Sequence, residues 1–261
     1  MTTATYSKDV IERAGELVEA DQAEAAAELL FESWQQDPDN AQLANTYACV
    51  CFSLGRVQEA ARILAVLVDN FPDDLRVLNN LGYLLLQEGL ITEAIERFEE
   101  ALAINPSDVE VLTNMGIALG HDDRDDEALK FFHLALQEDP QAVAARNNLG
   151  VILRRQGQLD KASIAFARVL EIDPTDASAA NNLGCVKRAQ GDLEAAREAF
   201  MLAVRLDPLS IAACRNLALC LKELGCNEPA RNELRRLIEL DPDGPMAAEA
   251  KAWLAVADDV G

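Results

Sequence analysis

Apolar and small residues recur along this chain on two helical faces that follow one another and then repeat. In residues 75–108 the first face consists of Leu78, Leu81, Gly82 and Leu85. The second face consists of Ala94, Phe98, Ala101 and Leu102. Spacings of three and four residues belong to one side of an α-helix. Gly89 stands between the faces, where its tolerance of positive φ suits a helix end. The pattern predicts a hairpin of two antiparallel helices.

The same pattern returns with a period of 34 residues. Seven prolines keep this spacing without a slip, namely Pro38, Pro72, Pro106, Pro140, Pro174, Pro208 and Pro242. A proline cannot continue a helix because it lacks the N–H group and its ring crowds the preceding turn, so each proline marks the end of a unit. A fixed period of this length indicates one supersecondary unit copied along the chain. The predicted units are residues 7–40, 41–74, 75–108, 109–142, 143–176, 177–210 and 211–244.

Three places of the unit keep a constant size. The eighth place is small: Ala14, Ala48, Gly82, Gly116, Gly150, Gly184 and Ala218. The twentieth place is alanine: Ala26, Ala60, Ala94, Ala128, Ala162, Ala196 and Ala230. The twenty-fourth place is large: Leu30, Leu64, Phe98, Phe132, Phe166, Phe200 and Leu234. Small residues let two helices approach closely, and the large residue fills the gap beside them. One such hairpin has too little core to fold alone, so neighbouring units must stack.

A family resemblance follows from these places. The phrase Asn-Asn-Leu-Gly, Gly, Glu-Ala, Phe, Ala and Asn-Pro, which runs from Asn79 to Pro106, closely resembles the tetratricopeptide repeat. The resemblance covers residues 7–244 in register. It implies an all-α fold, a right-handed α-solenoid of seven 34-residue helix-turn-helix units whose first helices line a concave groove. A flexible tail is expected at residues 1–6, and a capping helix with a tail at residues 245–261.

The reactive residue types argue against catalysis and bound metal. The six cysteines have neither the spacing of a zinc site nor a histidine companion. The sequence has no phosphate-binding glycine loop and no nucleophile motif. We therefore expect a protein that is not an enzyme and that binds no cofactor or metal. Reduced thiols suit a cytoplasmic protein, and no stretch is apolar enough for insertion into a membrane.

One acidic run raises the question of calcium. Residues 121–127 read His-Asp-Asp-Arg-Asp-Asp-Glu, but they lack the alternating ligands and central glycine of a calcium loop. We interpret the run as a solvated turn that replaces the usual glycine and brings acidic charge to the start of the next helix.

Function is then expected in the groove, where a row of asparagines stands out. The sixth place is occupied by Asn80, Asn114, Asn148, Asn182 and Asn216. A side-chain amide offers a donor and an acceptor together, which suits an extended peptide backbone. The row resembles the asparagine ladder in the repeat domain of O-linked N-acetylglucosamine transferases, which grips peptide backbones. Two interpretations stay open, because the same amides could instead bond neighbouring helices and support the stack.

The ninth place forms an apolar stripe on the same side. It reads Cys49, Tyr83, Ile117, Val151, Cys185 and Leu219, and Trp253 continues the count. Such a stripe can receive a partner's side chains, or it can be partly buried against the next helix.

Charge is distributed unevenly along the groove. The whole chain carries −22, yet the first helices of the last three units are basic. Their candidate binding residues are Arg154, Arg155, Arg188 and Lys222. Local charge opposed to the global charge favours a partner with acidic residues, although these side chains could also be solvated.

The sequence thus predicts a non-catalytic adaptor that holds a partner polypeptide, extended or helical and acidic, in its groove. The alternative is a structural module that oligomerises through its ends or its groove. Nucleic acid is not an expected partner, because a net charge of −22 repels phosphate.

Overall fold

The computed structural model describes residues 3–258, with side chains described for residues 7–255. Residues 3–258 contain α-helices and no strand. The helices are α1 (Thr3–Glu19), α2 (Ala23–Gln36), α3 (Ala41–Ser53), α4 (Val57–Asn70), α5 (Leu75–Gln87), α6 (Ile91–Ile104), α7 (Val109–His121), α8 (Asp125–Glu138), α9 (Val143–Arg155), α10 (Leu159–Ile172), α11 (Ala177–Ala189), α12 (Leu193–Leu206), α13 (Ile211–Glu223), α14 (Asn227–Leu240) and α15 (Pro245–Asp258). The predicted all-α repeat fold is confirmed.

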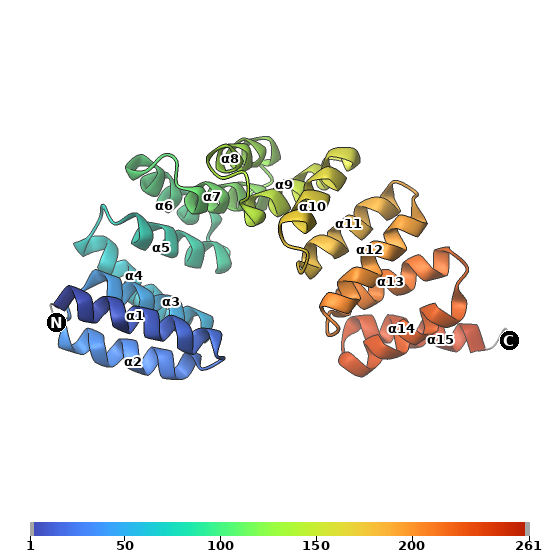
Figure 1. Ribbon diagram of the computed structural model, residues 1–261, viewed down its shortest axis with the longest axis horizontal. Coiled ribbons are helices and arrows are strands. Elements are labelled where there is room, and N and C mark those ends of the chain that lie inside the picture. The colour runs from blue at the N-terminus through green and yellow to red at the C-terminus, as the bar shows by residue number, and fades with distance from the viewer. Residues whose placement is uncertain (1–2, 259–261) are drawn as a thin grey trace. The chain divides into compact units, whose positions relative to one another are not determined.

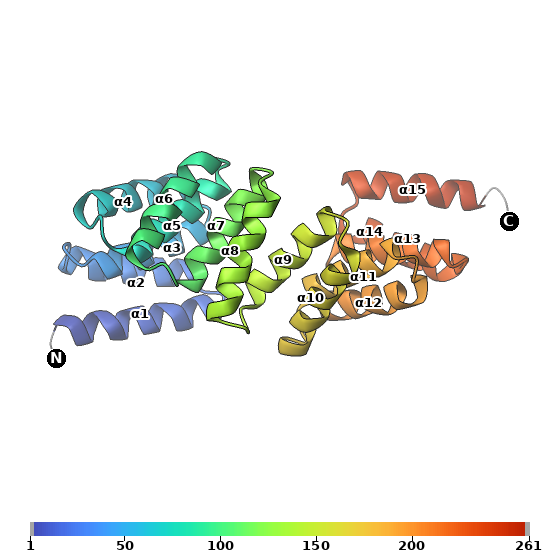
Figure 2. The ribbon, with the colours of Figure 1, turned by 90° about the horizontal axis from the view of Figure 1, so that it is seen from above.

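The chain forms two compact units, Met1–Glu138 and Asp139–Gly261. The first holds α1–α8, blue to green in Figure 1, and the second holds α9–α15, yellow-green to red. Within each unit every helix packs against the next one along the chain, as Figure 2 also shows from a perpendicular direction. The odd-numbered helices of a unit contact one another as well, so they form one layer. The single array predicted for residues 7–244 is not tested by this division and stays a prediction.

Local sequence explains where the helices begin. Two residues after most periodic prolines, a side chain accepts a hydrogen bond from a backbone N–H of the next helix's first turn. These N-caps are Asn40, Asp74, Asp108, Asp176 and Ser210. Each satisfies a donor that the helix itself leaves unpaired.

The turn inside the hairpin requires a residue with positive φ. Most repeats place a glycine there, at φ between 73° (Gly157) and 82° (Gly191). Asp123 takes the same conformation, with φ 56°, and α8 begins at Asp125. The acidic run therefore contains the turn that replaces glycine, at residues 122–124, and its last three acidic residues lie in the first turn of α8, as the interpretation expects.

Large side chains of the second helices fill the core. Phe98, Phe132, Phe166 and Phe200 are fully buried. Each lies against the glycine at the eighth place of its own repeat: a Cβ added to Gly82 would stand 2.6 Å from Phe98 Cε1. Such a distance is far below van der Waals contact, so the glycine is required by the close approach of the two helices.

The buried arc of the first helix differs from the one that its spacing suggests. In α5, Leu81 and Leu85 are only half-buried, whereas Val77 and Leu84 are buried. The fifth place is buried too, as Asn79 shows, although a helical wheel assigns it to the groove. The reason is that each odd-numbered helix packs both on its hairpin partner and on the neighbouring odd-numbered helix, which widens and rotates the arc.

The chain ends differ in part from expectation. The helix α1 begins at Thr3, inside the tail predicted for residues 1–6, because residues 3–6 contain no glycine or proline that would end it. The predicted capping helix corresponds to α15. Residues 1–2 and 259–261, which include the end of the tail predicted within residues 245–261, lie outside the described residues. None of the described helices is both long and apolar enough to cross a membrane.

Candidate functional site

Three of the predicted asparagines connect neighbouring repeats. In each case the Nδ2 group at the sixth place donates to the Oδ1 atom at the fifth place of the preceding repeat. The pairs are Asn80 with Asn45 at 3.0 Å, Asn114 with Asn79 at 2.9 Å, and Asn216 with Asn181 at 2.9 Å. These amides therefore support the stack of odd-numbered helices. Each keeps its own carbonyl oxygen, which accepts no hydrogen bond from the described side chains and backbone, so a role in peptide binding stays a prediction.

The other two asparagines depart from this pattern. Asn148 donates to the carbonyl oxygen of Ala144, one turn back in its own helix, at 2.9 Å. The fifth place of the preceding repeat is Thr113 rather than an asparagine. Asn182 makes no bond to Asn147, whose Oδ1 atom is buried without a hydrogen-bond partner among residues 3–258. The row is thus continuous in sequence but not in hydrogen bonding.

The three cations of the twelfth place have different surroundings. Arg188 forms a bidentate ion pair with Glu223, with its Nη2 atom 2.6 Å and its Nε atom 3.0 Å from the carboxylate. Lys222 lies over the ring of Trp253, with Nζ 5.0 Å from the ring centre, a cation–π contact. Arg154 is exposed and has no ion-pair partner among the side chains described, those of residues 7–255. Of the three, Arg154 is best placed to receive an anionic group from a partner.

Two of these charges act on one thiol. Burial raises the pKa of Cys185, while Arg154 and Arg188 oppose this rise. Both guanidinium groups therefore lie near Cys185, at the ninth place of its repeat, and the local potential there is positive. Arg155, the fourth predicted cation, is exposed at the end of α9.

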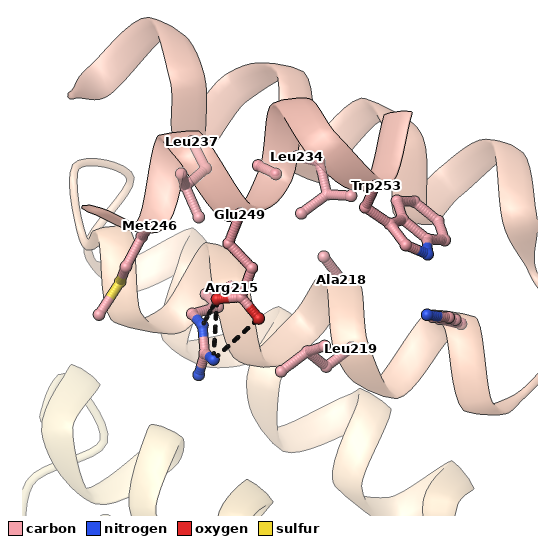
Figure 3. Close-up of a pocket in the computed structure, with 10 residues that line it drawn as sticks. Arg215, Ala218, Leu219, Leu234, Leu237, Met246, Glu249 and Trp253 are labelled. Atoms are coloured by element: carbon pink, nitrogen blue, oxygen red, sulfur yellow. Dashed lines mark hydrogen bonds and ion pairs between the residues drawn. The ribbon is translucent and has the colours of Figure 1, made fainter. Parts of the chain in front are cut away.

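A pocket of about 100 Å³ lies between α13, α14 and α15. Its apolar lining consists of Ala218, Leu219, Leu234, Leu237, Met246, Ala250 and Trp253. Figure 3 shows the ion pair at its edge, in which Arg215 meets Glu249 with nitrogen–oxygen distances from 3.1 to 3.4 Å. Met246 and Trp253 stand at opposite sides of the view. This α13–α15 pocket is small and apolar, and cations flank it.

The α13–α15 pocket contains residues that the sequence-based prediction missed. Arg215 stands at the fifth place, where four other repeats have asparagine, and Glu249 follows it by one full period of 34 residues. This 34-residue spacing could have predicted the ion pair, because residues one period apart lie on adjacent odd-numbered helices. Met246 gives no comparable signal, because its position depends on how α15 packs.

A second pocket, of about 290 Å³, opens on α3, α5 and α7 of Met1–Glu138. Its lining includes Cys49, Phe52, Asn80, Tyr83, Glu110 and Asn114. Tyr83, predicted from the apolar stripe, is 40% exposed and meets Phe52 edge to face, with ring centres 5.9 Å apart. Glu110 carries the only acidic group of this lining and accepts a hydrogen bond from Asn79 at 2.8 Å. This α3–α5–α7 pocket joins aromatic rings to a carboxylate.

Neither pocket contains a recognisable catalytic or metal-binding arrangement. Among the described residues, no group of three or more His, Cys, Asp or Glu side chains could hold a metal ion. All six cysteines are free thiols. The absence of a cofactor and of metal stays a prediction.

Comparison with known proteins identifies the repeats. Models of the tetratricopeptide repeat match residues 17–81, 141–209 and 187–254, and a model described as TPR repeat matches residues 82–121. Comparison of the sequence with curated proteins found no match.

Solved structures of similar fold include MamA (residues 41 to end) from Desulfovibrio magneticus RS-1, PilF from Pseudomonas aeruginosa and the Cut9–Hcn1 hetero-tetramer of the APC/C. MamA is 26% identical, with a TM-score of 0.58 over 66% of this chain and 97% of its own. PilF is 18% identical, with a TM-score of 0.71 over 82% of this chain and 98% of its own. The Cut9–Hcn1 match is 16% identical, with a TM-score of 0.79 over 91% of this chain and 47% of the other. The chain belongs to the tetratricopeptide repeat family.

Proposed function

We propose that this protein is a non-catalytic adaptor that holds an acidic segment of a partner polypeptide on the odd-numbered helices of Asp139–Gly261. The observation that carries the proposal is the exposed guanidinium of Arg154, which forms no ion pair with the described side chains (residues 7–255) in a chain of net charge −22. An unpaired cation on the layer of first helices offers a charge-assisted hydrogen bond to a carboxylate. The cytoplasmic location expected from the cysteines is part of the proposal.

Other features of the same unit support it. Arg188 and Lys222 lie at equal places on the next two odd-numbered helices, and the α13–α15 pocket offers an apolar recess beside Lys222. A peptide with carboxylates and one apolar anchor would match this combination of charge and apolar surface. The Cut9 structure, with its bound Hcn1, is in keeping with a repeat array that holds another polypeptide.

Selection from a random peptide library displayed on phage tests the proposal without a known partner. We expect the immobilised protein to enrich peptides rich in Asp and Glu, with binding that weakens above about 0.15 M salt, where charges are screened within about 8 Å. Enrichment of neutral or basic peptides alone on Asp139–Gly261 would contradict the acidic partner.

Variants identify the face that binds the selected peptides. Arg154→Glu should weaken binding about tenfold. This is the loss expected for one ion pair at a partly exposed position of the interface. The matched control is Arg168→Glu on α10, which makes the same charge change on a second helix of the same repeat, where Arg168 pairs with Glu171. Arg188 is not chosen, because its guanidinium is already held by Glu223 of the next odd-numbered helix and is less available to a partner. An effect of the Arg168 change without an effect of the Arg154 change would place the partner on the second helices.

A further inference from the structure

The α3–α5–α7 pocket has the opposite electrostatic character from the helices around Arg154. Within the described residues Glu110 has no salt-bridge partner, and the only hydrogen bond to its carboxylate comes from the neutral Asn79 amide. The helix α3 carries no charged residue, and α5 carries only Arg76, which pairs with Asp74 at 3.1 Å. The carboxylate charge at this pocket is therefore not balanced by a neighbouring cation.

Two further polar groups of the pocket have acceptor oxygens that are not used within the protein. Asn80 and Asn114 each commit an amide hydrogen to the preceding repeat, and their Oδ1 atoms accept nothing from residues 3–258. Together with the Glu110 carboxylate they give the pocket lining a set of acceptor oxygens. Such a set prefers a ligand that carries several donors and a positive charge.

The apolar walls suit the stem of a long side chain. Phe52 and Tyr83 present two rings at nearly perpendicular planes, 79° apart, and the cavity of about 290 Å³ is open to solvent. This volume is at the lower limit of pockets that enclose small molecules, and it is sufficient for one side chain. Lysine and arginine combine an apolar stem with a cationic head that aromatic rings attract.

We propose that the α3–α5–α7 pocket binds a lysine or arginine side chain of a partner polypeptide, with the cationic head at Glu110 and the stem against Phe52 and Tyr83. The inference rests on the proposed function, because the occupant is a side chain of a partner polypeptide. It differs in that this side chain is basic and binds Met1–Glu138, whereas the proposed acidic segment binds Asp139–Gly261. An acidic side chain would meet the Glu110 carboxylate and is excluded from this pocket.

A natural thiol reports the potential in each unit. Cys49 and Cys185 stand at the same ninth place of their repeats. Cys49 is exposed to solvent, but partial desolvation by its neighbours raises its pKa to about 11, and the negative charge of Glu110 adds to this rise. At Cys185, in contrast, Arg154 and Arg188 oppose the rise in pKa. The two thiols therefore serve as a matched pair, one in each electrostatic environment.

The first experiment compares labelling of the folded protein by a cationic and an anionic methanethiosulfonate, the trimethylammonium-ethyl and sulfonato-ethyl reagents. Labelling of each thiol is followed by peptide mass spectrometry and normalised to N-acetylcysteine amide. We expect the cationic-to-anionic rate ratio at Cys49 to exceed that at Cys185 about tenfold, because charges of opposite sign act on the two partly desolvated thiols. Glu110→Gln should remove the excess at Cys49 and leave Cys185 unchanged. The inference would be overturned by equal rate ratios at the two thiols, or by a rate ratio at Cys49 that is unchanged in Glu110→Gln.

The second experiment tests occupancy by a side chain. At millimolar concentration, acetyl-Ala-Arg-Ala-amide should slow the reaction of Cys49 with neutral iodoacetamide several-fold, and acetyl-Ala-Glu-Ala-amide should not. Protection should be lost in Glu110→Gln and reduced in Tyr83→Leu, which keeps an apolar wall but removes the ring. Both positions are exposed, so the helical circular dichroism should not change. Equal protection of Cys49 by the two peptides, or no protection by either, would contradict the proposal. Selection of acidic peptides depends on Arg154, so its failure is a separate result.

Discussion

At the residue scale, the eighth and twenty-fourth places of the repeat vary together. Repeats with phenylalanine at the twenty-fourth place have glycine at the eighth, and repeats with leucine there have alanine. The structure explains the pairing: a Cβ at Gly150 would lie 2.8 Å from both Cε1 and Cζ of Phe166. The helix–helix contact thus holds a constant total volume, distributed in two ways.

This pairing predicts a non-additive double mutant. Gly150→Ala should destabilise the protein by a net of about 1 kcal/mol, because overpacking costs about 1–3 kcal/mol and alanine recovers about 1 kcal/mol of helix propensity. Adding Phe166→Leu recreates the alanine–leucine pair of Ala48 and Leu64. The double mutant should therefore cost less than the sum of its single changes, with a coupling of about 0.5–3 kcal/mol in urea unfolding. Simple additivity would mean that the two places do not share one packing volume.

At the scale of the element, one first helix lacks the cap that its equivalents have. The residue before α9 is Ala142, which has the extended backbone of an N-cap (φ −62°, ψ 92°) but no side chain that can accept a hydrogen bond. The equivalent Asp176 accepts from the backbone N–H of Ala179 at 2.7 Å. The first turn of α9 therefore leaves donors unpaired that α11 satisfies.

Ala142→Asp should stabilise the protein by about 1 kcal/mol, the usual contribution of a capping side chain, helped by negative charge at a helix N-terminus. The expected rise in Tm is about 2–4 °C for a chain of this size, measured by circular dichroism. Asp176→Ala, a matched change in the same compact unit, should lower Tm by a similar amount. A loss at Asp176 without a gain at Ala142 would show that the backbone before α9 cannot support a cap.

The sequence predicts well those features that depend on residues close together along the chain, and it predicts poorly those that depend on packing between helices. Helix starts are predictable, because the proline and the cap two residues later act within one turn, as at Pro174 and Asp176. The buried face of a first helix is not predictable in this way, because neighbouring helices bury residues such as Leu84. The α13–α15 pocket is also beyond local inference, because the meeting of Arg215 and Glu249 depends on the packing of α15.

At the scale of the whole molecule, two features oppose self-association. The net charge of −22 makes copies of the chain repel one another. Large apolar side chains that are more than half exposed occur singly on different elements, namely Val66 on α4, Ile164 on α10, Met201 on α12 and Leu209 in the turn before α13. Scattered exposed apolar residues are normal on monomeric proteins.

The adaptor hypothesis therefore predicts a monomer, whereas a self-assembly module should grow with concentration. Sedimentation velocity from micromolar to hundreds of micromolar protein should give one species with the mass of a single chain at about 0.15 M salt, where the Debye length is about 8 Å. A second series at about 1 M salt, where it falls to about 3 Å, removes the repulsion and isolates any attraction between surfaces. We expect a monomer in both series, because the apolar surface is divided among separate recesses. One recess of about 620 Å³, beside Val66 and Phe71, is also lined by the polar Asp39, Arg62 and Asn70. A weight-average mass that rises with concentration at both salt levels would favour the structural module over the adaptor.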